Sequence, residues 1–299
     1  YNLNKNLDDY KDDYQSRAEY GNYLYGAPFG PNRNRDAKGL GIPIDLSLAF
    51  HTDAGITLND TAIGTLMIYT IAGLDTQNVF PDGVSRLANR DLSDIVQTQI
   101  VNDIRNLYDS TWTRRQLMNA NYSESARPNF PSMLLELLSH QNFYELKFEL
   151  DPRYRFDVSR SIYKGMLKFL SSQYGLEYVV QPLPPTNFAA ELNVNGEVSL
   201  SWKAQIDSLE STANADKFIL YTRQGEGGFD NGKIVETNNL KLNDLKPGII
   251  YSYKVTALNN GGESFPTEIL SVCWMKNSSE PILIVNGFDR LSAPASFDS

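Results

Sequence analysis

Hydrophobic and polar positions change their spacing along the chain, and the change divides it into two parts. In the first part, apolar residues between Ser85 and Tyr108 recur every three or four positions, which predicts a helix with one buried face. Residues 157–174 repeat this pattern, and 14–25 predict a shorter helix. Shorter apolar runs are typical of buried strands and lie at 42–51, 64–71 and 133–138. Long helices alternating with such strands predict an α/β domain, with a mostly parallel sheet and helices on both faces.

After Gln181 the spacing becomes that of short alternating strands. Three prolines within 182–185 predict a stiff linker and a domain boundary. Turn residues then separate five alternating segments, at 198–202, 217–222, 241–245, 251–257 and 269–274. This spacing predicts an all-β sandwich. We therefore expect domains at 1–181 and 182–276, followed at 277–299 by a tail or a further domain that begins with a strand at 281–285.

The second part resembles a fibronectin type III module. The resemblance rests on Leu200-Ser-Trp202, on Leu245-Lys-Pro-Gly248 leading to Tyr251, and on Val255-Thr-Ala-Leu-Asn259. Tyr251 matches the position of the tyrosine corner, and the indole of Trp202 would fill the core. The resemblance implies that both aromatic residues are structural.

Composition and charge narrow the classes of function. The 27 Lys and Arg residues against 36 Asp and Glu give a net charge of −9, and no basic cluster is present, which disfavours nucleic-acid binding. No run of 18 apolar residues is available to span a membrane. The one cysteine, Cys273, excludes an internal disulfide and is interpreted as a buried side chain at a strand end. The composition is that of a folded, soluble protein with only two histidines, His51 and His140.

Two polar residues stand where the local pattern is apolar. His51 ends a predicted strand, and Glu136 lies within the run Leu134–Leu138. A carboxylate inside a buried strand must be paired, bound to a metal or protonated, because burying an isolated charge is costly. A salt bridge to Arg127 or Arg160 would make Glu136 structural, and a hydrogen bond beneath the glycine-rich segment would do the same for His51. In an open α/β sheet, however, ligands bind beyond the strand ends, so both residues are candidates for a site.

The segments around these residues resemble the zinc-dependent N-acetylmuramoyl-L-alanine amidases. Residues 44–54 resemble the family's strand ending in Ser-Ile-His-Ala-Asn-Ala, and 131–142 resemble its Pro-x-x-Leu-x-Glu segment ending in Ser-Asn. Arg17-Ala-Glu-Tyr-Gly-Asn22 is similar to the family's Arg-x-x-x-Ala-Asn helix end. The two long helices, the second of which carries Gly165, follow in the family's order. The resemblance spans roughly Arg17 to Tyr174.

The resemblance implies that His51 is a zinc ligand and Glu136 the catalytic carboxylate of a bacterial cell-wall hydrolase, which cleaves the amide between muramic acid and L-alanine in peptidoglycan. Zinc lowers the pKa of a bound water, and a carboxylate carries the proton. The family's Gly-His-Gly ligand and its helix-borne Glu ligand have no match here, although catalytic zinc normally has three protein ligands. Because Tyr1 is not an initiator Met, we expect further ligands upstream of it. His140 is interpreted as a polar loop residue, or as a member of the site if the chain turns after Ser139.

Two other functions stay open at this point. The chain would be a catalytically inactive glycan-binding or scaffold protein if the ligands are missing altogether. It would be a secreted polysaccharide-degrading enzyme if the module at 182–276 accompanies that kind of chemistry. The expected partner is peptidoglycan or another cell-surface glycan, and the expected location is extracytoplasmic: periplasmic, cell-surface or secreted.

Overall fold

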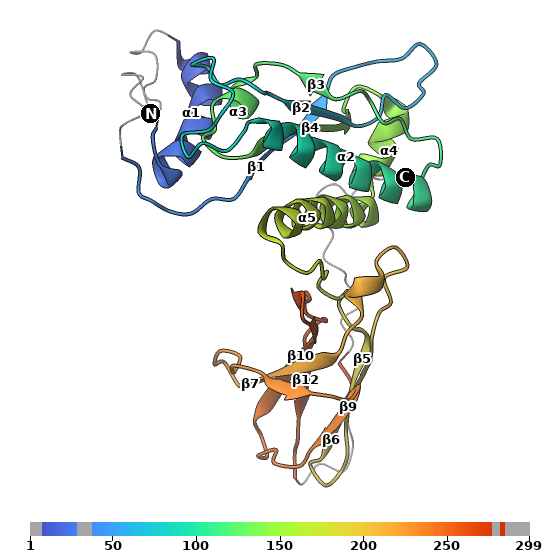
Figure 1. Ribbon diagram of the computed structural model, residues 1–299. Helices are drawn as coiled ribbons and strands as arrows, with labels where there is room; N and C mark the ends of the chain where they lie inside the picture. Colours follow the sequence, from blue (N-terminus) through green and yellow to red (C-terminus); the bar gives the residue numbers. More distant parts are fainter. Residues whose placement is uncertain (1–7, 29–37, 277–281, 285–299) are drawn as a thin grey trace. The chain divides into compact units, whose positions relative to one another are not determined.

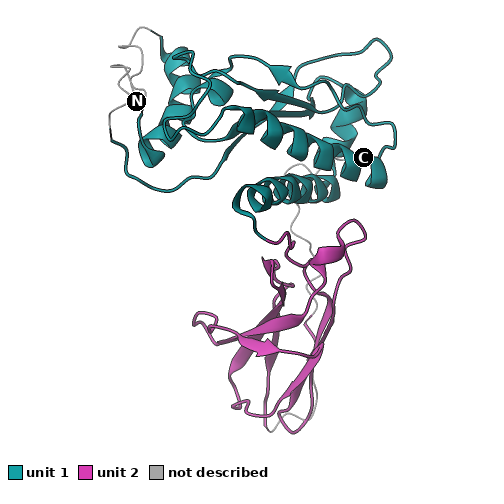
Figure 2. Cartoon of the chain, viewed as in Figure 1, with its two compact units in different colours: residues 1–176, 290–299 teal, residues 177–289 magenta. Residues whose placement is uncertain are grey.

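The protein is a chain of two compact units. The computed structural model describes residues 8–28, 38–276 and 282–284. One unit takes in Tyr1–Leu176 and the other Glu177–Asp289 (Figure 2). The strand expected at 281–285 and the tail at 277–299 lie largely outside the described residues, and the described part, Ile282–Ile284, is exposed and belongs to no strand.

Unit 1 combines helices with a small sheet (Figure 1). Its described elements follow in the order α1 (Asp9–Tyr25), β1 (Ser47–Asp53), β2 (Leu66–Tyr69), α2 (Leu87–Leu107), β3 (Met118–Asn119), α3 (Ser123–Ala126), β4 (Ser132–Ser139), α4 (Phe143–Leu150) and α5 (Pro152–Tyr174). The strands lie in the order β1-β4-β2-β3. β1 pairs with β4 and β2 with β3 in parallel, whereas β2 runs antiparallel to β4. The predicted α/β domain with a mostly parallel sheet is confirmed.

The two faces of this sheet carry different cores because side chains alternate along each strand. On one face, Met133 and Leu135 of β4 pack with apolar residues of α2 and α5, such as Val96 and Ile162. On the other face, Leu134 packs with residues of β2 and β1. Glu136 follows the alternation of Leu134, so it belongs to this second face, which α3 also covers.

Several elements of unit 1 differ from the sequence-based expectation. α1 starts at Asp9 and not at 14, because Asp8 caps it by accepting from Lys11 N at 3.2 Å. β1 starts at Ser47 and not at 42, because the amide of Ile42 donates to Leu24 O at the end of α1. α4 was not predicted. It starts after Asn142, whose side chain accepts from Glu145 N and ends the extended run of β4.

Unit 2 is a sandwich of two antiparallel sheets. Its described strands are β5 (Thr186–Leu192), β6 (Val198–Lys203), β7 (Lys217–Gln224), β8 (Lys233–Val235), β9 (Asn239–Leu242), β10 (Ile250–Asn259), β11 (Gly262–Glu263) and β12 (Leu270–Cys273), with a short 3₁₀ turn at Ser211–Ala213. One sheet has the order β11-β10-β7-β8, with β12 also on β10, and the other has the order β5-β6-β9. Trp202 and Tyr253 are buried between them. The all-β sandwich is confirmed.

Cys273 is exposed and not buried as predicted. The reason is the alternation along β12, which turns Leu270 and Val272 toward the core and Ser271 and Cys273 toward solvent. β9 lies at 239–242 and not at 241–245, since its residues pair with 198–201 of β6. None of the helices in the described ranges is long and apolar enough to cross a membrane.

Candidate functional site

His51 and Glu136 face each other on adjacent strands. They are register partners in the parallel pair of β1 and β4, so their side chains leave the same face of the sheet. β1 ends two residues after His51, and β4 ends three residues after Glu136. Both side chains are partly buried. The fold therefore joins, near the carboxyl end of two parallel strands, two residues that are far apart in the sequence.

Glu124 of α3 also belongs to this cluster. Its Oε2 lies 3.0 Å from His51 Nε2, and its Oε1 accepts from Arg17 of α1 at 3.1 Å. Arg17 also pairs with Asp13 one turn earlier, at 2.7 Å. The sequence patterns did not point to Glu124, because it lies in a four-residue helix with no periodicity to read. Arg17, in contrast, lies in the segment 17–22, which resembles the helix end of the amidases.

A second ion pair closes the other side of the cluster. Arg115 donates to Asp53 Oδ2 at 2.5 Å, and Asp53 follows His51 by two residues on β1. Burial acts to raise the pKa of Asp53, but the hydrogen bonds from Arg115 and from the amide of Ala54 outweigh it and hold that pKa below its usual range. Asp53 is therefore a charged anchor for Arg115 at neutral pH.

Glu136 is in a different electrostatic state. Burial raises its pKa, and the nearby carboxylates of Asp53 and Glu124 act in the same direction, while the charges of His51 and Arg115 oppose them. Its Oε2 atom is buried without a hydrogen-bond partner. The alternative partner Arg127 pairs with Glu19 instead, at 3.2 Å. Glu136 thus holds a proton at a higher pH than an ordinary glutamate does, which is a property of general acids.

A hollow of about 580 Å³ opens beside the end of β1. Its lining comes from 50–52 of β1, from Leu137 and Leu138 of β4, and from α4 and α5 between Glu149 and Ser159. This volume lies within the range of small-molecule sites, and apolar walls with a few polar groups are usual in them. Leu137, Tyr154 and Val158 belong to the core on the α5 side of the sheet, so the hollow reaches the end of β1 at His51 but is not lined by Glu136 or Glu124.

His140 lies on the exposed turn that follows β4. Its amide donates to Asp53 O at 3.0 Å, and its Nδ1 lies 3.2 Å from Thr52 Oγ1. Glu145 of α4 supports the same turn from inside. Its buried carboxylate accepts from the amides of Gly64 and Ser139, both at 2.6 Å. The turn after Ser139 is thus fixed on both sides, and His140 contacts β1 through Thr52.

The donors in this cluster do not fit a catalytic zinc by themselves. Within 8–28, 38–276 and 282–284, no three or more His, Cys, Asp and Glu side chains are placed to hold a metal ion. His51 Nε2 is also engaged by Glu124, which Arg17 holds from the other side. A guanidinium next to the carboxylate opposes the approach of a divalent cation. His51 is therefore at most one ligand of a larger set.

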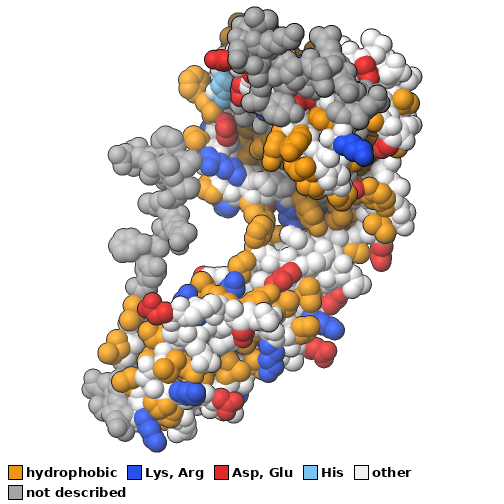
Figure 3. Space-filling view, turned by 90° about the vertical axis from the view of Figure 1, so that its left-hand side faces the viewer, with side chains coloured by type: hydrophobic (Ala, Val, Ile, Leu, Met, Phe, Trp, Pro, Cys, Tyr) orange, Lys and Arg blue, Asp and Glu red, His pale blue; other side chains and the backbone are white. Residues whose placement is uncertain are grey.

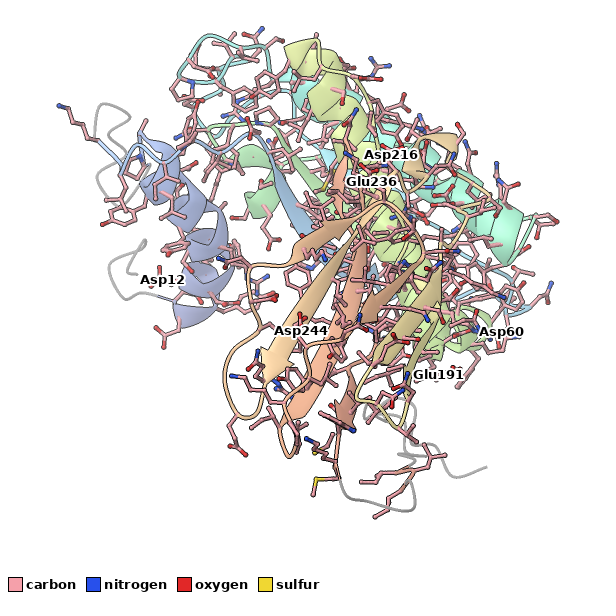
Figure 4. The ribbon with its side chains drawn as sticks, turned by 90° about the horizontal axis from the view of Figure 1, so that it is seen from below. Asp12, Asp60, Glu191, Asp216, Glu236 and Asp244 are labelled. Carbon is pink, nitrogen blue, oxygen red and sulfur yellow. The ribbon has the colours of Figure 1, made fainter. Side chains whose placement is uncertain are left out.

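The charges elsewhere are dispersed. On the face seen in Figure 3, Lys and Arg side chains lie in small groups among acidic and neutral ones, without a broad basic field. Acidic side chains are spread over separate elements of both units, as Figure 4 shows for Asp12, Asp60, Glu191, Asp216, Glu236 and Asp244.

The sandwich of unit 2 contains a tyrosine corner, in which Tyr251 Oη accepts from the amide of Lys246 at 3.1 Å. Residues 183–272 match the family model of the fibronectin type III domain. This part of the chain is a fibronectin type III domain, as its sequence predicts. No curated protein matches the sequence.

Solved structures resemble parts of this chain. The twitchin kinase region from C. elegans is 21% identical, with a TM-score of 0.30, over 34% of this chain and 18% of that one. The FN5 domain of Drosophila Lar is 19% identical, with a TM-score of 0.25, over 31% of this chain and 97% of that one. An N-acetylmuramoyl-L-alanine amidase from Clostridium difficile 630 is 19% identical, with a TM-score of 0.34, over 43% of this chain and 59% of that one. The chain thus spans less than two thirds of the twitchin region and of the amidase.

Proposed function

We propose that unit 1 acts on bacterial peptidoglycan at the amide between muramic acid and L-alanine. The observation that carries this proposal is the register pairing of His51 with Glu136, whose side chains leave one face of the sheet. The motifs around both residues, which resemble those of the amidases, supply the substrate class. The peptidoglycan partner and an extracytoplasmic location belong to the same proposal.

Glu136 would carry the proton in this reaction. In its ionised form, its partly buried carboxylate would take a proton from the attacking water and pass it to the leaving amine of L-alanine, and the raised pKa favours holding that proton in between. Arg115 and Asp53 would hold the end of β1 in place during this transfer. Zinc enters our proposal only for a longer polypeptide, in which donors that precede Tyr1 join His51, since the described residues do not fit the metal on their own.

The test is cleavage of purified muropeptides, followed by mass spectrometry for the new amine of L-alanine. The present chain and a longer polypeptide should both be assayed, with and without zinc. Glu136→Gln should lower the cleavage rate by roughly 10²- to 10⁴-fold while the protein stays folded. Asp60→Asn, on the exposed loop between β1 and β2, is the matched control. Equal cleavage by the wild type and Glu136→Gln, or cuts within the glycan, would overturn the proposal.

A second candidate is a peptidoglycan-binding domain without catalysis. The contacts that favour it are those of Glu124, which ties His51 to Arg17 and so occupies the nitrogen that a metal would need. In this case the chain would sediment with purified peptidoglycan and cleave nothing, and Glu136→Gln would leave cleavage at zero. Cleavage that depends on Glu136 would rule this candidate out.

A further inference from the structure

Glu124 stands between Arg17 and His51 and touches one with each carboxylate oxygen. Oε1 accepts from Arg17 at 3.1 Å, and Oε2 lies 3.0 Å from His51 Nε2. The Glu124 side chain is 16% exposed, against 31% for His51 and 48% for Arg17. The carboxylate is therefore the most buried member of a row that runs from α1 through α3 to β1.

The location of the protons in this row follows from the chemistry of its members. An ionised carboxylate only accepts hydrogen bonds, and a guanidinium only donates them. The hydrogen bond and the charge of Glu124 raise the pKa of Arg17, since a nearby anion stabilises the cation. With Arg17 donating to one oxygen, the other oxygen of Glu124 accepts the hydrogen on His51 Nε2. In a neutral imidazole with this hydrogen, Nδ1 is the nitrogen that keeps a lone pair.

We propose that Glu124 is a positioning residue of the site, which orients the His51 ring through Nε2–H and leaves Nδ1 as the nitrogen with a free lone pair. This rests on the proposed function only in that His51 is taken as part of the site. A consequence is that Glu124 and a metal ion compete for Nε2. A metal can reach that atom only when Glu124 moves away.

The test measures the reactivity of each histidine toward diethylpyrocarbonate, which modifies an imidazole nitrogen that has a free lone pair. The chain has two histidines, so peptide mass spectrometry follows His51 while the exposed His140 serves as an internal reference. Ser123→Ala in the same helix is the matched control, because the buried hydroxyl of Ser123 has no hydrogen-bond partner. In the wild type, His51 should be modified readily, because its Nδ1 keeps a free lone pair.

Glu124→Ala should slow the modification of His51 several-fold, because a carboxylate that accepts Nε2–H makes Nδ1 a stronger nucleophile. Glu124→Gln keeps the shape of the side chain but not its charge, so it should slow the modification to a smaller extent. The glutamine variant leaves the exposure of His51 unchanged, and it decides the matter if the alanine variant does not fold. Modification of His51 that is as fast in Glu124→Gln as in the wild type, or faster, would overturn the proposal.

These readouts need no hydrolysis, so absent cleavage contradicts the proposed function alone. Where a longer polypeptide does cleave muropeptides, Glu124→Gln should lower kcat with little change in KM, because the residue orients His51 and does not touch the substrate. A change in KM alone would contradict the positioning role.

Discussion

Gly165 of α5 lies so close to Val96 of α2 that a Cβ atom on the glycine would be 2.8 Å from the Cα of Val96. The two helices share the main core of unit 1, and the missing side chain allows them this close approach. Gly165→Ala should therefore destabilise unit 1 by about 1–3 kcal/mol, although alanine is the better helix former. Urea unfolding measures the loss. Gly228→Ala, where a Cβ would meet nothing within 4 Å, should leave stability unchanged.

A second prediction concerns the pH dependence that Glu136 confers. Burial raises its pKa in the folded state above its usual 4.5, so the folded protein keeps a proton that the unfolded chain has released. Between these two pKa values the stability of the wild type falls as pH rises, whereas glutamine does not ionise. The melting temperature of Glu136→Gln relative to the wild type should therefore rise as the pH increases above 4.5. A difference that is independent of pH would contradict the raised pKa.

Glu145 should matter for the stability of unit 1, although it is outside the cluster around His51. Its fully buried carboxylate accepts from the amides of Gly64 and Ser139 and so fixes the turn after β4. Glu145→Ala leaves these buried donors without an acceptor and should cost about 2–4 kcal/mol in thermal or urea unfolding. Asp91→Ala, on the exposed side of α2, should change stability by less than about 0.5 kcal/mol.

Two tyrosines of β10 allow a controlled comparison of hydroxyl groups in the fibronectin type III domain. Tyr251 Oη accepts from Lys246 N at 3.1 Å, whereas the buried hydroxyl of Tyr253 has no hydrogen-bond partner. Tyr251→Phe should destabilise unit 2 by about 1 kcal/mol through loss of this bond. Tyr253→Phe should be neutral or stabilising, because it removes an unsatisfied buried hydroxyl. Equal losses in both variants would show that the corner bond contributes nothing.

The last prediction concerns metal dependence of the fold. The described residues offer no group of three metal-binding side chains, and unit 1 and unit 2 each have an apolar core. A chelator should leave the melting temperature of the chain unchanged within about 2 °C, since a structural metal would make folding strongly metal-dependent. A larger drop in calorimetry would reveal ligands beyond these residues.

The local pattern of apolar residues was enough to predict the long helices and the fold class of each unit. In α2 and α5, apolar residues recur every three or four positions, and this spacing puts them on one face only in a helix. After the proline linker, short strands with alternating apolar residues are typical of a sandwich. Element ends were less certain. Capping by Asp8 and Asn142 set two of them, and a cap depends on one side chain reaching one amide.

The candidate site could also be predicted only in part. From the sequence alone, His51 and Glu136 stand out as polar residues within apolar strands, and they are candidates for a site because burying a charge is costly. The register pairing of these two residues, and the contacts with Glu124 and Arg17, become visible in the folded protein, since they connect α1, β1, α3 and β4. Hydrogen bonds between residues far apart in the chain leave no periodicity in the sequence. Their partners are decided by how the helices and strands pack.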